Sequence, residues 1–176
     1  PGKNHGLYIP DGKTVYHGWG MPVSTHVTGP DKKPLPDRLK ITYYSYLEDQ
    51  FYRGEFALPY ETIIKSFQEG YRDHKTPAGW LRYRRITVGL APGGNVAVWL
   101  VGIGKTTEIF FGKAEPIEYD WAKYWKDSFM NDHPRPREDY FQESLEVFLT
   151  PDQRRRLETE GIPFDKWERM RKHYYW

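Results

Sequence analysis

The chain has 176 residues, a formal net charge of +2 and no cysteine. This length is typical of one domain and allows a hydrophobic core to form without a metal or a disulfide. The lack of cysteine excludes disulfides, thiolate metal sites and a cysteine nucleophile. The near-balanced charge gives no indication of nucleic-acid binding, which usually shows as a strong basic bias.

The N-terminal region, residues 1–39, is rich in glycine and proline, which favours short strands separated by turns. We expect strands at 14–19 and 23–28. No apolar run is long enough to span a membrane. Because the chain begins with Pro1 rather than Met, we interpret it as a mature fragment whose targeting segment has been removed.

Residues 38–58 predict a β-hairpin, since side chains alternate along 38–46 and a second strand follows a turn at 47–50. A short helix is expected from 59 to 70. Its apolar side chains recur at helical spacing, and Gly70 is a suitable end for it.

Residues 72–85 contain the strongest mixture of basic and aromatic side chains, and we expect a loop there. This segment is either an ordinary solvated loop or a contact surface for an acidic partner, because Trp, Tyr and Arg dominate binding hot spots. The candidate partner-binding residues are Arg72, Lys75, Trp80, Arg82, Tyr83, Arg84 and Arg85.

Three strands are predicted between residues 86 and 112. The middle one, 95–103, is apolar on both faces, as in the centre of a sheet. The Ala-Pro-Gly-Gly sequence at 91–94 suits a type II turn, with glycine at the position that needs positive φ. The pair Gly104-Lys105 suits a two-residue type II′ turn.

Residues 100–106, LVGIGKT, end in Gly-Lys-Thr, which is also how a phosphate-binding loop ends. That loop requires a glycine five positions before Gly104, where this chain has Trp99. The residues that follow favour a strand, so no helix N-terminus offers N–H groups to a phosphate. We therefore expect no nucleotide and no other cofactor.

Helical patterns dominate the last third of the chain. Aromatic residues at helical spacing in the first of them predict a core-facing surface, and Thr150 followed by Pro151 predicts a capped helix start. Helices are expected at 121–129, 140–148, 151–160 and 164–173.

These elements predict an α+β protein with a single domain over residues 1–176. Residues 1–115 are mainly β, an antiparallel sheet or sandwich with one short helix near 60–70. Residues 116–176 form a helical tail packed on that core.

No sequence pattern identifies a catalytic or metal site. The G-x-S-x-G nucleophile elbow is absent, and His17 with His26 is too small a set for zinc. Glu48 and Asp49 are candidates for a carboxylate pair, but on a hairpin turn we expect them to be solvated. Ser45 and Glu48 match a capping box, although no helical pattern follows. We expect a protein that is not an enzyme.

Two longer segments and a short Leu-Pro match between them resemble a family of Gram-negative bacterial lipoproteins classed as a domain of unknown function. Residues 43–52, YYSYLEDQFY, resemble its W-[FY]-S-L-x-E-x-x-F-Y segment, and the Leu-Pro pair at 58–59 resembles the one that follows it. Residues 89–100, GLAPGGNVAVWL, resemble its G-L-A-P-G-G-x-V-x-V-W-L hallmark. The similarity covers about 36–112. Its structural motif residues are Ser45, Glu48, Pro92, Gly93, Gly94 and Trp99.

The resemblance implies export to the periplasm, where an acylated cysteine in the full-length protein anchors it to a membrane. It also implies an immunity protein that binds and neutralises a type VI secretion effector, the expected effector being a phospholipase or another lipase. No catalytic residues come with the resemblance. Two other functions stay open: a carbohydrate or cell-wall binding module that uses exposed aromatic side chains, and an unrecognised hydrolase.

Overall fold

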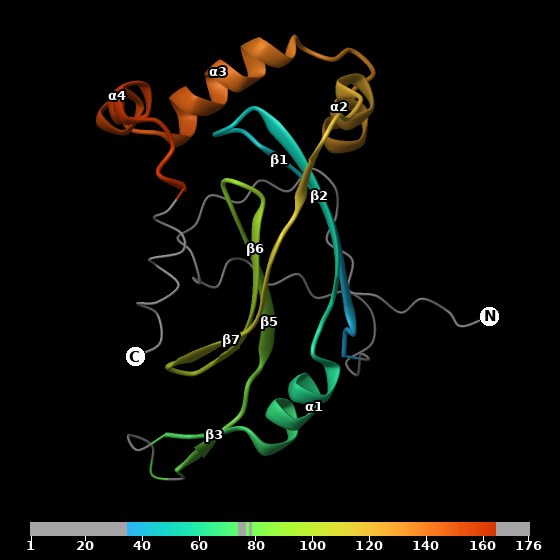
Figure 1. Cartoon of the computed structure of the whole chain (residues 1–176), viewed down its shortest axis with the longest axis vertical. Coiled ribbons are helices and arrows are strands. Elements are labelled where there is room, and N and C mark those ends of the chain that lie inside the picture. The colour runs from blue at the N-terminus through green and yellow to red at the C-terminus, as the bar shows by residue number, and fades with distance from the viewer. Residues whose placement is uncertain (1–34, 74–76, 78, 165–176) are drawn as a thin grey trace, which may run out of the picture.

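The computed structural model describes residues 35–73, 77 and 79–164, and it confirms an α+β fold with strands first and helices later (Figure 1). The strands expected at 14–19 and 23–28 lie outside the described residues. So do Lys75, the histidines His17 and His26, and nearly all of the helix expected at 164–173.

The predicted hairpin is confirmed. It consists of β1 (Arg38–Ser45) and β2 (Gln50–Ala57), which pair antiparallel over their whole lengths. A short third strand, β8 (Glu115–Ile117), pairs with the other edge of β2. The sequence gives no strand signal for β8 because Pro116 lies within it, and proline is tolerated in a sheet only at an edge strand.

The second sheet has the order β5-β6-β7, formed by β5 (Arg85–Ala91), β6 (Asn95–Gly102) and β7 (Lys105–Lys113). The central strand β6 is buried from its first residue to its seventh, as its apolar pattern predicts.

The turns of this sheet depend on glycine. In the turn after β5, Gly93 and Gly94 both have positive φ, 76° and 77°. After β6, the turn residues are Ile103 and Gly104, and only Gly104 has positive φ. The predicted type II′ turn at Gly104-Lys105 is therefore wrong. Lys105 already belongs to β7, and a β-branched residue such as Ile103 avoids the positive φ that a type II′ turn would require of it.

The segment predicted as a loop contains a small hairpin, β3 (Tyr71–Arg72) and β4 (Trp80–Leu81). Two residues per strand are too few for an alternating pattern to be recognised in the sequence. Before it lies α1 (Tyr60–Glu69), close to its predicted bounds.

The later helices are α2 (Trp121–Phe129), α3 (Arg137–Phe148) and α4 (Pro151–Glu160). Thr150 caps α4 in a full capping box with Gln153, as its sequence predicts. Asp120 caps α2 by accepting hydrogen bonds from the N–H groups of its second and third residues.

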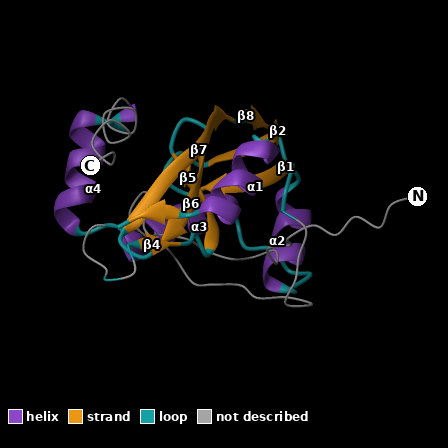
Figure 2. Ribbon diagram, turned by 90° about the horizontal axis from the view of Figure 1, so that it is seen from below, coloured by secondary structure: helices purple, strands orange, loops and turns teal. Residues whose placement is uncertain are grey.

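The two three-stranded sheets face each other across a shared core (Figure 1). Tyr52 of β2 packs there with Val96 of β6 and with Leu39 and Ile41 of β1. At one end, α1 closes the core with the fully buried Ile63. Figure 2 shows α1 across this end of the strands and α4 to one side of them. The helices α2 and α3 cover the opposite end (Figure 1).

Candidate functional site

Glu48 lies in the turn between β1 and β2, where three donors converge on its carboxylate. It accepts hydrogen bonds from Ser45 Oγ (2.7 Å), from Tyr52 Oη (2.8 Å) and from the backbone N–H of Gly93 (2.8 Å). The expectation of a solvated carboxylate is therefore wrong. The last bond joins the two segments that carry the family resemblance, since Gly93 belongs to the Ala-Pro-Gly-Gly turn.

The tyrosines around Glu48 stay protonated. Tyr43 and Tyr52 stack with ring centroids 5.4 Å apart. Burial, followed by the nearby Glu48 charge, raises the pKa of the Tyr43 hydroxyl well above its usual range. Burial and the hydrogen bond to Glu48 do the same to the pKa of Tyr52. Tyr52 thus remains a donor, and Glu48 serves as an acceptor in the scaffold.

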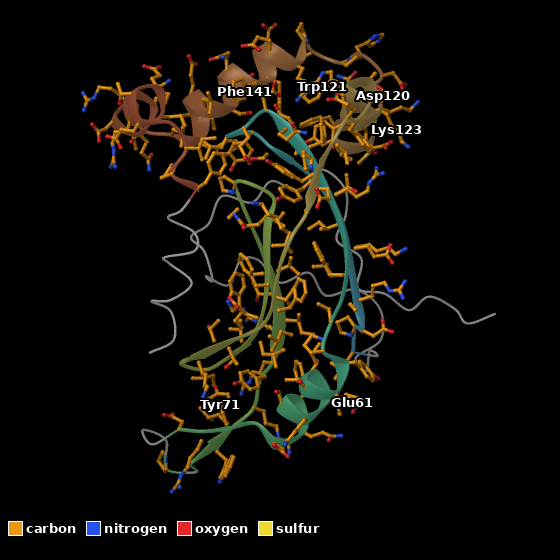
Figure 3. All side chains as sticks on the ribbon, viewed as in Figure 1. Glu61, Tyr71, Asp120, Trp121, Lys123 and Phe141 are labelled. Atoms are coloured by element: carbon orange, nitrogen blue, oxygen red, sulfur yellow. The ribbon has the colours of Figure 1, made fainter. Side chains whose placement is uncertain are left out.

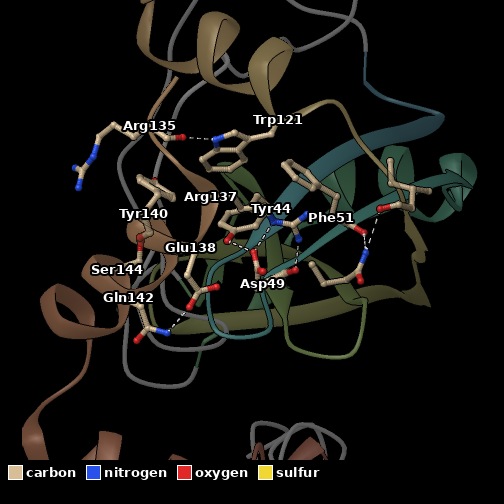
Figure 4. Close-up of polar contacts among 12 residues, drawn as sticks. Tyr44, Asp49, Phe51, Trp121, Arg135, Arg137, Glu138, Tyr140, Gln142 and Ser144 are labelled. Atoms are coloured by element: carbon tan, nitrogen blue, oxygen red, sulfur yellow. Dashed lines mark hydrogen bonds and ion pairs between the residues drawn. The ribbon is translucent and has the colours of Figure 1, made fainter. Parts of the chain in front are cut away.

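Asp49 follows in the same turn with a left-handed backbone, φ 49°. Its Oδ1 accepts hydrogen bonds from Tyr44 Oη at 2.5 Å and from Arg137 Nε at 2.6 Å (Figure 4). Its carbonyl oxygen accepts a further hydrogen bond from Arg137 Nη2. The same guanidinium lies over the rings of Tyr44 and Phe51, at 5.8 Å and 5.5 Å. Asp49 is therefore not solvated either; it connects the hairpin to α3.

Aromatic side chains of α2 and α3 surround this connection. Trp121 and Tyr124 of α2 and Tyr140 of α3 each lie within about 6 Å of the Tyr44 ring centroid. Trp125 is buried, which confirms the core-facing aromatic surface, but Phe129 at the end of α2 is 42% exposed. This end of the molecule is thus a packed layer, which Asp49 connects to the hairpin, while Glu48 connects the hairpin to the turn after β5.

The opposite end of the molecule contains the basic segment, residues 72–85, and Tyr71 connects it to the second sheet. The buried Tyr71 donates a hydrogen bond from its hydroxyl to the carbonyl oxygen of Ile103 (2.7 Å). Gly102 is required beside it, because a Cβ there would lie 2.4 Å from the Tyr71 hydroxyl. The Lys105 ammonium lies 5.6 Å from the centre of the same ring. Tyr71 therefore joins the β3–β4 hairpin to the turn between β6 and β7.

Burial alternates along residues 80–84. Trp80, Arg82 and Arg84 are exposed, Trp80 by 63%, whereas Leu81 and Tyr83 point into the core. The Tyr83 hydroxyl lies 2.6 Å from Thr107 Oγ1. Of the predicted contact residues, Tyr83 is thus a core residue that positions its neighbours, because an extended chain turns alternate side chains to opposite faces.

The exposed arginines of this end are Arg72, Arg82, Arg84 and Arg85, and none of them forms an ion pair within the part of the chain that the structure describes. The arginines of α3 and α4, by contrast, are paired with carboxylates. We call the exposed side chains of Arg72, Trp80, Arg82, Arg84 and Arg85 the basic end.

Other features of the described residues are weaker candidates. A shallow groove of about 310 Å³ lies between α3 and α4, with Leu145, Pro151 and Leu157 between charged side chains. Within the described ranges, no group of His, Asp and Glu residues is arranged to hold a metal ion. No described helix has both the length and the apolar character needed to cross a bilayer.

The fold and its surface define an α+β domain in which two antiparallel sheets pack face to face and one end presents exposed arginines, without an ion pair among the described residues, beside an exposed tryptophan. The chain belongs to the family described as "Protein of unknown function (DUF2931)", whose model matches residues 5–165. The match extends on both sides of the segments that carry the resemblance. Comparison with curated proteins and with solved structures finds no match.

Proposed function

We propose that this protein is an immunity protein, which binds an antibacterial effector of a type VI secretion system in the periplasm and blocks it. The observation that carries the proposal is the basic end, where exposed arginines without a described ion pair lie beside Trp80. Arginine and tryptophan are the side chains most enriched in binding hot spots.

The way the basic end is built supports binding to another protein. Its exposed side chains lie on the β3–β4 hairpin and on the residues that lead from it into β5, and Tyr71 and Tyr83 fasten this stretch to the core. A preorganised surface loses little conformational freedom when a partner binds. A cluster of one charge sign also speeds the encounter with a partner of the opposite sign. Both properties suit a protein that must capture a toxin before the toxin acts.

The resemblance to exported lipoproteins supports the periplasm as the place of action, with membrane attachment through a lipid anchor. It also supports a lipase, in particular a phospholipase, as the class of effector. Blocking such an effector requires no reactive group in the immunity protein, because occlusion of the effector is sufficient.

The proposal is tested by co-expression with the effector encoded beside the gene. Cells that export the effector to their periplasm should survive when the protein is exported with it, and the two purified proteins should form a stable complex. If the cells die and no complex forms, the immunity function is wrong.

The same preparations decide between the alternatives. Binding of the isolated protein to peptidoglycan or to a glycan array, with no affinity for the effector, would favour a cell-wall binding module. A hydrolytic activity that is lost on substitution of Glu48 or Asp49, in variants that still fold, would favour a hydrolase.

A further inference from the structure

We propose that the turn between β6 and β7 completes the contact surface through Ile103 and Lys105, and that the whole surface binds an acidic patch with an apolar centre on the partner protein. This inference rests on the proposed function and deepens it. It adds residues that lie outside the basic segment and assigns a chemistry to the partner.

The first support is the fixed position of the turn relative to the hairpin. The Tyr71 hydroxyl holds the Ile103 carbonyl, and the N–H of Arg84 donates to the carbonyl of Val101 at 2.9 Å. The hairpin is therefore bonded to the turn through Tyr71, and the segment that follows the hairpin is bonded to the end of β6 just before that turn. Figure 3 shows Tyr71 at this end of the molecule, near α1.

The second support is exposed apolar surface. Ile103 is 56% exposed at the tip of its turn, and Trp80 is 63% exposed on the neighbouring hairpin. No atom of the described residues lies within 4 Å of the position that a Cβ of Gly104 would take, so the described part of the chain leaves the tip open. Large apolar side chains surrounded by polar ones are typical of the centre of a protein contact.

The third support is charge. Arg72 pairs with Trp80 across the hairpin, Arg82 and Arg84 are exposed just after it, and Lys105 adds a cation held above the Tyr71 ring. Asp73 is the only acidic residue in the sequence ranges 71–85 and 101–107. The surface therefore fits a partner that supplies carboxylates.

Arginine predominates over lysine here, and this favours a protein partner over an anionic membrane. A guanidinium group is a planar fork that pairs with a carboxylate through two parallel hydrogen bonds. Such pairing suits the exposed arginines on the hairpin and on the segment that follows it. Attraction to a lipid surface depends mainly on the number of cations and not on their geometry.

The experiment measures binding kinetics of the purified effector from the neighbouring gene at low and at high salt. Lys105→Glu should slow association by about tenfold at low salt, with a smaller effect at high salt. Ile103→Ser should speed dissociation by about tenfold, since most interface substitutions act on that rate.

Matched controls at the opposite end are Lys123→Glu on α2 and Val147→Ser on α3, the latter 67% exposed (Figure 3 labels Lys123). They make the same chemical changes and should leave both rate constants within about twofold of the wild-type values. Thermal unfolding of each variant establishes that the fold is retained.

The outcomes separate this inference from the proposed function. If the wild-type protein does not bind the effector, the proposed function fails. If it binds and Ile103→Ser and Lys105→Glu behave like their controls, the function stands and this surface is wrong. If the wild-type protein binds vesicles containing phosphatidylglycerol, and both substitutions abolish that binding while effector binding is unchanged, the surface is a membrane contact and the inference is overturned.

Discussion

At the residue scale, Glu48 carries the most connections in the turn after β1. Its carboxylate accepts hydrogen bonds from a serine, a tyrosine and a backbone N–H of the other sheet. Each donor would lose a charged acceptor if this side chain were removed, and hydrogen bonds to charged groups contribute more than neutral ones. Glu48 therefore connects the two sheets at the end nearest α2 and α3.

We predict that Glu48→Ala lowers the free energy of unfolding by about 2 kcal/mol, because three donors lose their acceptor. Urea unfolding followed by fluorescence measures the change. The control is Glu55→Ala, which removes a carboxylate that is half exposed and paired with Arg38 and Lys40. The control should cost less than about 1 kcal/mol. Equal losses would show that the Glu48 network contributes no more than a surface ion pair.

We predict that the protein loses stability in alkaline solution, because folding raises the pKa of Tyr124. Burial among aromatic rings, with Tyr140 as the next cause, raises the pKa of Tyr124 from its usual 10.0 to about 12. A tyrosine of the unfolded chain ionises first, so the contribution of this residue is fully present below pH 10. It decreases as the pH rises towards 12.

Unfolding measured at several values between pH 8 and pH 11.5 tests this prediction. Tyr124→Phe keeps the ring and removes the ionisable group, so its stability should fall less over this interval than that of the wild-type protein. Parallel curves for the two proteins would contradict the raised pKa.

At the scale of elements, Arg137 makes the polar connection between α3 and the first hairpin. Arg137, the first residue of α3, reaches both the carboxylate and the carbonyl of Asp49, and its guanidinium lies against two aromatic rings. The pair is half-buried, so water screens it less than an exposed one. The aromatic side chains of α2 and α3 then pack around this connection.

We predict that Arg137→Ala destabilises the protein by about 2 kcal/mol, because Asp49 and Tyr44 both lose a charged partner. Arg137→Lys should recover only part of this, since an ammonium cannot reproduce the two-point contact. In the Arg137→Ala variant, the backbone amides of α3 should exchange hydrogen faster than those of β6. The control is Arg155→Ala, which breaks an exposed pair with Asp152 on α4 and should cost less than about 0.5 kcal/mol. Equal effects of the two alanine substitutions would mean that Arg137 does not fasten α3.

At the scale of the whole molecule, the two ends of the sheets differ in character. One end is closed by helices whose aromatic side chains pack inward on Tyr44 and Phe51. The other presents Trp80 and exposed arginines that have no ion pair among the described residues, next to the buried Tyr71 and Tyr83. The first arrangement stabilises the fold, and the second is the surface that we propose binds a partner.

We predict that Trp80→Ala combined with Arg84→Ala weakens binding of the effector by about 2 kcal/mol or more without unfolding the protein. Calorimetry or surface binding with the purified effector measures the affinity. Met130→Ala combined with Lys123→Ala is the matched control, one exposed apolar residue and one exposed cation at the opposite end. Unchanged affinity of the Trp80 and Arg84 variant would show that the basic end does not bind the effector.

The sequence by itself determined the elements that local physics dictates. Alternation predicted the first hairpin, a continuous apolar run predicted the central position of β6, and Thr150 with Pro151 predicted the start of α4. It also indicated the basic end, because the arginines and Trp80 lie close together within residues 72–85. These signals lie within a few residues of one another, and propensity and periodicity act over that range.

The tertiary structure alone decided which of these residues act together. Glu48 and Gly93 are 45 residues apart, and Asp49 and Arg137 are 88 apart. It also buried Tyr83 and brought the turn at Ile103 to the basic end through Tyr71. No local pattern encodes such pairings, because they depend on how the two sheets and the helices pack. The carboxylates that the sequence predicted to be solvated are for this reason the residues that hold the fold together.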